Sequence, residues 1–176
     1  MPKTIVYVTC ALVLAGAVGC GTQPGPAIEV QQVSNIDKSK YLLSEEPDGA
    51  VGVIIAREDS KDQDEIILVG RIGGQKNPWI KDRSAFTVID AAMAVVANGE
   101  ESDGAEVCLE DCCASMRAEC TTLVKIVDEQ GKPLEIDARD LLDAKENDMV
   151  VVRGIVHRNE EQGVFNIAAT GVYIRR

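Results

Sequence analysis

The chain has 176 residues, with 18 Lys and Arg against 29 Asp and Glu, which gives a net charge of −11 at pH 7. This acidity argues against nucleic acid and anionic lipid headgroups as partners, because binding to phosphates requires a basic surface. Aromatic residues make up only 3% of the chain, so Val, Ile, Leu and Ala must build the core of one principal domain.

Residues 1–19 are typical of a bacterial lipoprotein signal peptide. Lys3 is followed by an uncharged run over 5–18, and the small residues Ala17-Val18-Gly19 precede Cys20. We therefore expect an exported protein that is anchored in the bacterial cell envelope by a lipid on Cys20. Since no Asp follows Cys20 directly, the expected destination is the outer membrane or the cell surface.

An alternative at this segment is ordinary cleavage after Ala17, because Ala15-Gly16-Ala17 is an Ala-x-Ala site, with release of a soluble protein. The run is too short for a transmembrane helix, which needs about 20 apolar residues. The cysteine count favours lipidation. With Cys20 modified, the mature chain keeps an even set of cysteines, whereas cleavage at Ala17 would leave Cys20 as an odd thiol.

Residues 20–46 predict the anchor and a flexible, disordered tether. Gly21–Pro26 is rich in Gly and Pro, which resist helices and β-ladders. The stretch 27–40 is polar and lacks a clear hydrophobic period. A spacer between lipid and folded domain is the expected role.

Residues 47–176 predict a mainly β domain. The first ten residues of this part, 48–57, fit a short helix or a strand, and a helix is slightly favoured. Five later segments are dominated by β-branched residues and bounded by turn residues: 65–72, 85–90, 121–127, 149–157 and 164–174. In the second of these, Phe86 and Val88 alternate with Thr87 and Ile89, which predicts one buried face.

One helix is expected between the third and fourth strands, over 137–144, where Asp137 can cap it and Leu141 and Leu142 can be buried. Three strands, a helix and two strands are the element order of the OB-fold. The sequence therefore predicts a small five-stranded OB-like barrel with one short helix.

Residues 97–120 form a Cys-containing insertion between the second and third predicted strands. Its cysteines follow the spacing Cys-x3-Cys-Cys-x6-Cys: Cys108, Cys112, Cys113 and Cys120. Because export favours oxidised cysteines, we expect disulfides that staple the insertion. A Cys112–Cys113 bridge would be strained, so Cys108 is expected to pair with Cys113 or Cys120 and Cys112 with the other, and the connectivity stays open.

The alternative for these cysteines is a zinc site in which four thiolates enclose the metal. If 107–119 is helical, Cys108 and Cys112 share one face, which suits chelation. A redox role is less favoured, because Glu110 and Asp111 would raise the pKa of neighbouring thiols.

The remaining candidates have plainer explanations. His157 is the only histidine, so Ser/His/Asp or Cys/His catalysis would need it, yet its place at a strand end indicates a surface residue. The acidic run 58–65 lacks the Gly and terminal Glu of a calcium loop and predicts a solvated turn. Trp79 is a candidate ligand contact at the barrel mouth, although packing is favoured.

Several segments are similar to a group of uncharacterised planctomycete lipoproteins that carry a predicted OB-like domain and a Cys-containing insertion. The resemblance covers residues 40–176 and rests on these runs: Glu46-Pro-Asp-Gly-Ala50, Val69-Gly-Arg-Ile-Gly-Gly74, Pro78-Trp79, Ala85-Phe-Thr-Val-Ile-Asp90, Val151-Val-Arg-Gly154 and Ala169-Thr-Gly-Val-Tyr-Ile174. It implies the fold and an envelope location, and it implies no activity.

The sequence thus predicts a lipid-anchored, non-enzymatic binding or scaffold module without a cofactor. Its expected partners are the membrane, through Cys20, and an envelope protein, a saccharide or a cation. The alternative is a zinc-binding envelope lipoprotein. A single-stranded nucleic-acid-binding OB-fold is a third hypothesis, which the charge and the few aromatic residues argue against.

Overall fold

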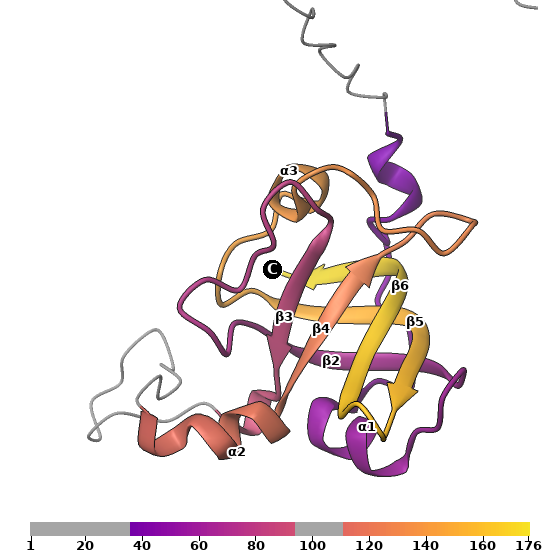
Figure 1. Cartoon of the computed structure of the whole chain (residues 1–176). Helices are drawn as coiled ribbons and strands as arrows, with labels where there is room; N and C mark the ends of the chain where they lie inside the picture. The colour runs from indigo at the N-terminus through magenta and orange to yellow at the C-terminus, as the bar shows by residue number, and fades with distance from the viewer. Residues whose placement is uncertain (1–35, 94–110) are drawn as a thin grey trace, which may run out of the picture. The chain divides into compact units, whose positions relative to one another are not determined.

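The computed structural model describes residues 36–93 and 111–176 (Figure 1). In chain order, its elements are η1 (Lys38–Lys40), β1 (Val51–Gly52), α1 (Val53–Asp59), β2 (Glu65–Ile72), β3 (Ala85–Ile89), η2 (Ala91–Met93), η3 (Asp111–Cys113), α2 (Ala114–Glu119), β4 (Thr121–Ile126), α3 (Ala138–Leu142), β5 (Met149–Asn159) and β6 (Val164–Arg175). The fold is mixed α/β and mostly strand, with a few short helices.

The five predicted strands are confirmed as β2 to β6, with ends that differ from the prediction by at most two residues. The predicted helix is confirmed as α3, which begins one residue after Asp137. The Asp137 side chain caps it by accepting a hydrogen bond from the backbone N of Arg139 at 2.9 Å. Leu141 and Leu142 of α3 are buried as expected.

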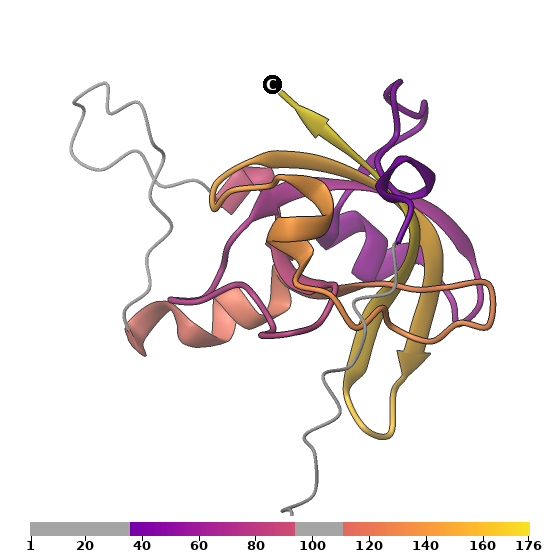
Figure 2. The same cartoon turned by 90° about the horizontal axis from the view of Figure 1, so that it is seen from above.

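All strands belong to one sheet in the order β1-β2-β3-β4-β6-β5, and β5 pairs a second time with β2. Strands β2 to β6 therefore form a near-closed ring of five strands, to which β1 adds a short sixth. Neighbours are antiparallel, except that β1 is parallel to β2 and β4 is parallel to β6. The strands β5 and β6 are the longest and extend beyond the ring as a hairpin (Figure 2).

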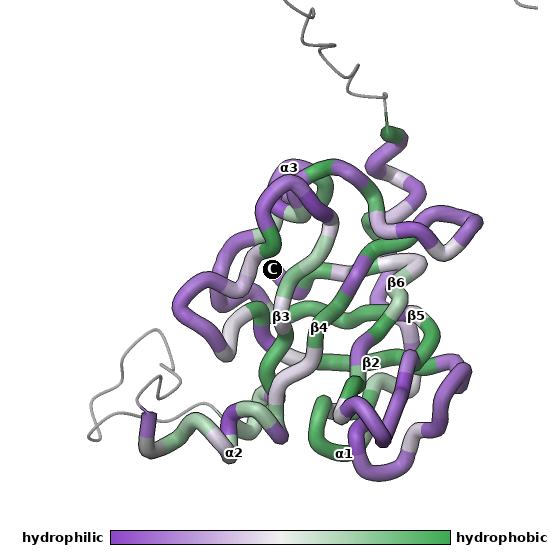
Figure 3. The backbone as a smooth tube through the Cα atoms, viewed as in Figure 1, coloured by the Kyte–Doolittle hydropathy of each residue, from purple (hydrophilic) through white to green (hydrophobic). Residues whose placement is uncertain are grey.

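The core lies inside this ring. Burial alternates along strand β2, with Ile66, Leu68 and Ile72 at most 8% exposed. Both α1 and α3 add side chains to the core, and they lie at opposite ends of the ring in Figure 1. The hydropathy along the backbone follows the same plan, because apolar residues gather in the strands and polar residues in the connections (Figure 3).

Strand β3 departs from the prediction of one buried face, because all five of its residues are buried. The cause is the β2–β3 connection, which folds back along β3. Thr87 Oγ1 donates to the carbonyl oxygen of Gly73 at 2.8 Å, and Gly73 and Gly74 lie against Ile89. The backbone of the connection also pairs with the edge of β3, where Thr87 N donates to Pro78 O at 2.8 Å. This connection covers the outer face that Thr87 and Ile89 were expected to expose.

The segment 48–57 contains both of the elements that the sequence allowed. Val51 and Gly52 pair with Leu68 and Val69 of β2 as a two-residue parallel strand. Helix α1 begins directly afterwards, and its Val53 and Ala56 are buried in the core.

The folded unit begins before residue 47, which corrects the predicted end of the tether. Tyr41 is 6% exposed, and the segment runs beside β6, where Val172 N donates to Tyr41 O at 2.7 Å and Leu43 N donates to Val172 O at 2.8 Å. These hydrogen bonds hold the chain on the sheet because Val172 offers both its N–H and its C=O to it. The signal peptide 1–19 and most of the tether lie outside the described residues.

The insertion 97–120 is described only from residue 111, as η3 and α2 (Figure 1). Helix α2 is short, and its Met116 is 59% exposed. Within the described ranges, no helix is long and apolar enough to cross a membrane.

Candidate arginine-lined binding site

The start of α1 is bound by a side chain from another part of the chain. Gly52 precedes the helix and cannot cap it, so Ile54 N donates to Oδ2 of Asp90 at 3.0 Å. The other carboxylate oxygen accepts from Ala92 N at 2.8 Å, and Asp90 is 7% exposed. A Cβ on residue 52 would lie 2.6 Å from Asp90 Oδ2, so glycine leaves the room that this carboxylate needs.

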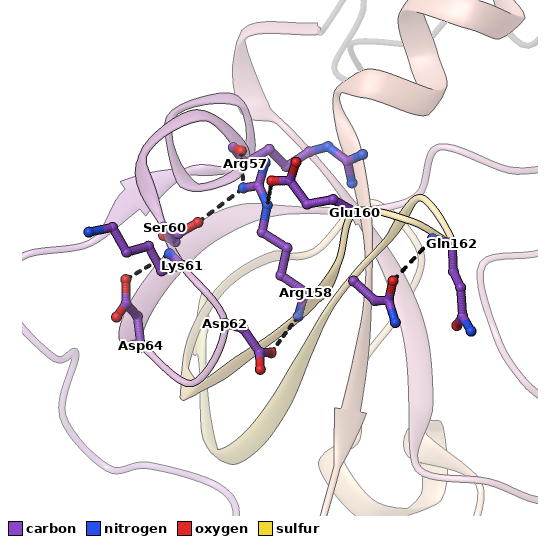
Figure 4. Close-up of polar contacts among 9 residues, drawn as sticks. Arg57, Ser60, Lys61, Asp62, Asp64, Arg158, Glu160 and Gln162 are labelled. Atoms are coloured by element: carbon purple, nitrogen blue, oxygen red, sulfur yellow. Dashed lines mark hydrogen bonds and ion pairs between the residues drawn. The ribbon is translucent and has the colours of Figure 1, made fainter.

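The end of α1 is bound by Arg158 of β5. Its Nη1 donates to the carbonyl oxygen of Arg57 at 2.6 Å and to that of Ser60 at 3.0 Å (Figure 4). The final carbonyls of a helix lack partners and carry a partial negative charge, so a guanidinium stabilises them. The backbone N of Arg158 donates to Asp62 at 2.8 Å, and this hydrogen bond is the main reason that the pKa of Asp62 is lowered.

Arg57 and Arg158 both lie over the ring of Phe165 in β6. Their guanidinium carbons are 5.1 Å and 5.9 Å from the ring centre, which is within cation–π range. We call the shallow pocket beside them the arginine notch. It has a volume of about 210 Å³ and is lined by Arg57, Arg158, Asn159, Glu160, Gly163, Val164 and Phe165.

The two arginines of the notch differ in their partners. Arg158 uses its donors on Arg57 O, on Ser60 O and, through Nε, on Glu160 at 2.8 Å. The Arg57 side chain makes one hydrogen bond, from Nη1 to the carbonyl oxygen of Thr121 at 3.2 Å. Within 36–93 and 111–176, no carboxylate lies within ion-pair distance of Arg57. A guanidinium has five N–H donors, so most of those of Arg57 remain available.

The cysteines are not brought together by the described part of the insertion. Cys113 precedes α2 and Cys120 follows it, so they lie at opposite ends of the helix. Seven helical steps separate their Cα atoms by about 10 Å, whereas a disulfide needs less than about 7 Å.

Cys120 is a free thiol that is 6% exposed. Burial raises its pKa, with a further contribution from the negative charge of Asp90. Among the described residues, no three His, Cys, Asp or Glu side chains lie close enough to share a metal ion. Cys20, Cys108 and the side chain of Cys112 lie outside the described part of the chain.

Trp79 packs in the core and offers little surface to a ligand. It is 9% exposed, forms an isolated bridge with Phe86, and its ring centre lies 5.8 Å from that of Phe86. The guanidinium of Arg139 lies over the same ring at 5.8 Å. The favoured prediction of packing is therefore confirmed.

His157 is exposed on β5, and its Nδ1 lies 3.3 Å from Nε2 of Gln63. The acidic run that faces it forms the predicted turn between α1 and β2. Lys61 N donates there to Asp64 Oδ2 at 2.7 Å, and Asp62 is used by Arg158 as described above (Figure 4). The carboxylates of this turn thus accept backbone hydrogen bonds.

A larger depression of about 570 Å³ lies over β2 and β5. A bulge in β5 between Arg153 and Gly154 borders it, and Ile67 and Ile155 form its apolar part. Its charged side chains, Glu65 and Arg153, are both exposed. Water therefore screens them, and their electrostatic attraction for a ligand is weak.

Comparison of the chain with protein-family models, with curated proteins and with solved structures gives no match. The resemblance to planctomycete lipoproteins therefore stays a prediction. The residues of the notch were not expected from the sequence. The one available signal was an Arg beside the single histidine, since Arg158 follows His157 at the end of a predicted strand.

Proposed function

We propose that this chain is a non-enzymatic binding module with an OB-like five-stranded barrel, carried at the bacterial cell envelope by a lipid on Cys20. The observation that carries the proposal is the strand order. Strands β2-β3-β4-β6-β5 return to β2 with β4 parallel to β6, and α3 lies between β4 and β5. A small β-ring of this kind presents its loops and outer faces to ligands.

The net negative charge of the chain favours some classes of partner over others. The chain carries 29 acidic against 18 basic residues, so an envelope protein, a saccharide or a cation fits better than nucleic acid. Filter binding at low salt tests this directly. Detectable affinity for single-stranded oligonucleotides would favour the nucleic-acid hypothesis instead.

Metabolic labelling with a fatty-acid analogue tests the anchor. The full chain is expected to incorporate the label and to lose it on Cys20→Ala. The matched control is Cys10→Ala, which changes a cysteine inside the predicted signal peptide and should leave labelling intact. A mature N-terminus at Val18 would contradict lipidation and support cleavage after Ala17.

The insertion could be held by disulfides or by a zinc ion, and measurements on one protein preparation distinguish these two states. Disulfides that staple it predict no bound metal and fewer free thiols in denaturant than cysteines. A four-cysteine zinc site predicts four free thiols and about one equivalent of zinc. The separation of Cys113 from Cys120 by α2 argues against a single four-thiolate cage unless α2 unwinds.

A further inference from the structure

Arg57 is a half-buried cation with no ion-pair partner among residues 36–93 and 111–176, in a chain of net charge −11. Arg57 is only partly exposed, stacks on Phe165 and gives a single side-chain hydrogen bond to a carbonyl oxygen. Partial burial removes water from a guanidinium, and a carboxylate normally restores the lost interactions. No carboxylate of the described part of the chain takes this place beside Arg57.

We propose that the arginine notch binds the carboxylate group of a small organic ligand and that Arg57 is the residue that contacts it. The proposal names a ligand chemistry for the binding module and so rests on the proposed function. The planar guanidinium of Arg57 presents parallel N–H donors, which match the two oxygens of a carboxylate. The ring of Phe165 holds this plane in place and keeps water from one side of it.

Arg158 positions the notch and does not bind the ligand. Its Nη1 holds the last carbonyls of α1, and its Nε holds Glu160. These bonds fix the end of α1 from which the Arg57 side chain departs. Three hydrogen bonds already use Nε and Nη1 of Arg158, whereas Arg57 makes one among the described residues, so Arg57 has more N–H groups left for a ligand.

The charge and the size of the notch favour a carboxylate over a phosphate. Arg57, Arg158 and Glu160 together leave one net positive charge among its lining residues, which matches a monoanion. A dianion would gain little there, and the net charge of the chain opposes it. A volume of about 210 Å³ is below that of pockets which enclose whole drug-sized ligands, so a terminal group is the expected occupant.

The test is an NMR titration of the full chain, purified in a non-ionic detergent, with sodium acetate against sodium chloride at equal ionic strength. The Arg57 Nε–Hε resonance is expected to shift in a saturable way with acetate, with a Kd on the order of millimolar, and not with chloride. Arg57→Gln should weaken acetate binding at least about tenfold. Arg153→Gln is the matched control, because it removes an exposed arginine of β5 that lies outside the notch, and it should leave the affinity unchanged.

Glu160→Gln is the second variant, and it tests the proposal even if Arg57→Gln fails to fold. Glu160 is 77% exposed in its side chain, so its loss is tolerated, and removal of its negative charge should tighten acetate binding about twofold or more. Three results would overturn the proposal: no saturable shift with acetate, tighter binding of inorganic phosphate than of acetate, or equal losses from Arg57→Gln and Arg153→Gln. Lipid labelling of Cys20 is independent of all three, so failure of the anchor and failure of the notch are distinguished.

Discussion

At the scale of single residues, Gly52 and Asp90 form one unit at the start of α1. The Asp90 carboxylate occupies the space where a Cβ of residue 52 would stand, at 2.6 Å, and from there it caps Ile54 N. Gly52→Ala should therefore lower the free energy of unfolding by about 1–2 kcal/mol, because the carboxylate must move away from the amide. Chemical denaturation of both proteins measures the difference.

A double-mutant cycle separates this explanation from a general effect of changing a glycine. Asp90→Ala alone should lower the free energy of unfolding by about 1–3 kcal/mol, since Ile54 N and Ala92 N lose their acceptor. In that background Gly52→Ala should cost almost nothing, because nothing is left to collide with. Gly73→Ala is the control, as its Cβ would meet only Ile89 Cγ2 at 3.8 Å. If the losses of unfolding free energy from the two substitutions are additive, Gly52 and Asp90 act independently and the explanation is wrong.

The residues of the arginine notch show why single positions are hard to interpret from sequence. Arg57 lies in a short amphipathic segment, Arg158 beside an exposed histidine, and Phe165 in a strand where an aromatic residue is expected to be buried. Each has an ordinary explanation alone. Only the fold brings the end of α1, the end of β5 and the start of β6 to one place, because β5 and β6 form a hairpin that passes α1.

At the scale of elements, α2 sets a limit on the chemistry of the insertion. In a variant whose only cysteines after Cys20 are Cys113 and Cys120, mild oxidation of the folded protein should leave both thiols free. The helix between them holds their Cα atoms about 10 Å apart. The same oxidation in denaturant should form the bridge, and mass spectrometry after alkylation distinguishes the two products. A bridge formed under native conditions would show that α2 opens.

Helix α3 makes a pH-dependent contribution to stability through its cap. The hydrogen bond from the Arg139 side chain is the main cause that lowers the pKa of Asp137 below its ordinary value of 3.8. A carboxyl whose pKa is lower in the folded state stabilises the protein above 3.8 and loses this effect as pH falls through the folded value. The stability gap between the wild type and Asp137→Asn should thus be present at neutral pH and close in acid. A gap that widens in acid would contradict the assigned cause.

The elements differ in how well the sequence predicts them. Strands β2 and β4 to β6 could be found because β-branched runs end at clear turns, and α3 because Asp137 is a good cap. The two buried faces of β3 could not be found. They depend on the Gly73–Ile80 connection lying back on the strand, which is a tertiary contact and leaves no period in the sequence. Both elements of 51–59 were allowed by the sequence, but the boundary between them could not be found, since Asp90, far along the chain, binds the start of α1.

At the scale of the whole molecule, α1 joins parts of the ring that the strands themselves connect only weakly. Strands β2 and β3 share two residue pairs, Arg71 with Ile89 and Ile72 with Val88. Helix α1 is fixed to the chain after β3 through Asp90 and to β5 through Arg158. The charged contacts at its two ends therefore close the ring where backbone pairing is short. The same clamp builds the notch, so stability and the candidate binding site depend on one short helix.

The ring also depends on a close crossing of β2 and β3 at Gly70. A Cβ there would lie 2.5 Å from Val88 Cγ1 and 2.7 Å from the carbonyl oxygen of Ile89, and the second of these neighbours is backbone that cannot rotate away. Gly70→Ala should therefore lower the free energy of unfolding by about 3 kcal/mol or more, although alanine by itself is less costly than glycine to order in a strand. Denaturation measures this difference beside Gly73→Ala, since Gly73 follows β2 directly and has no such close contact. A cost equal to that of Gly73→Ala would mean that β2 and β3 are not pressed together at the point where the ring closes.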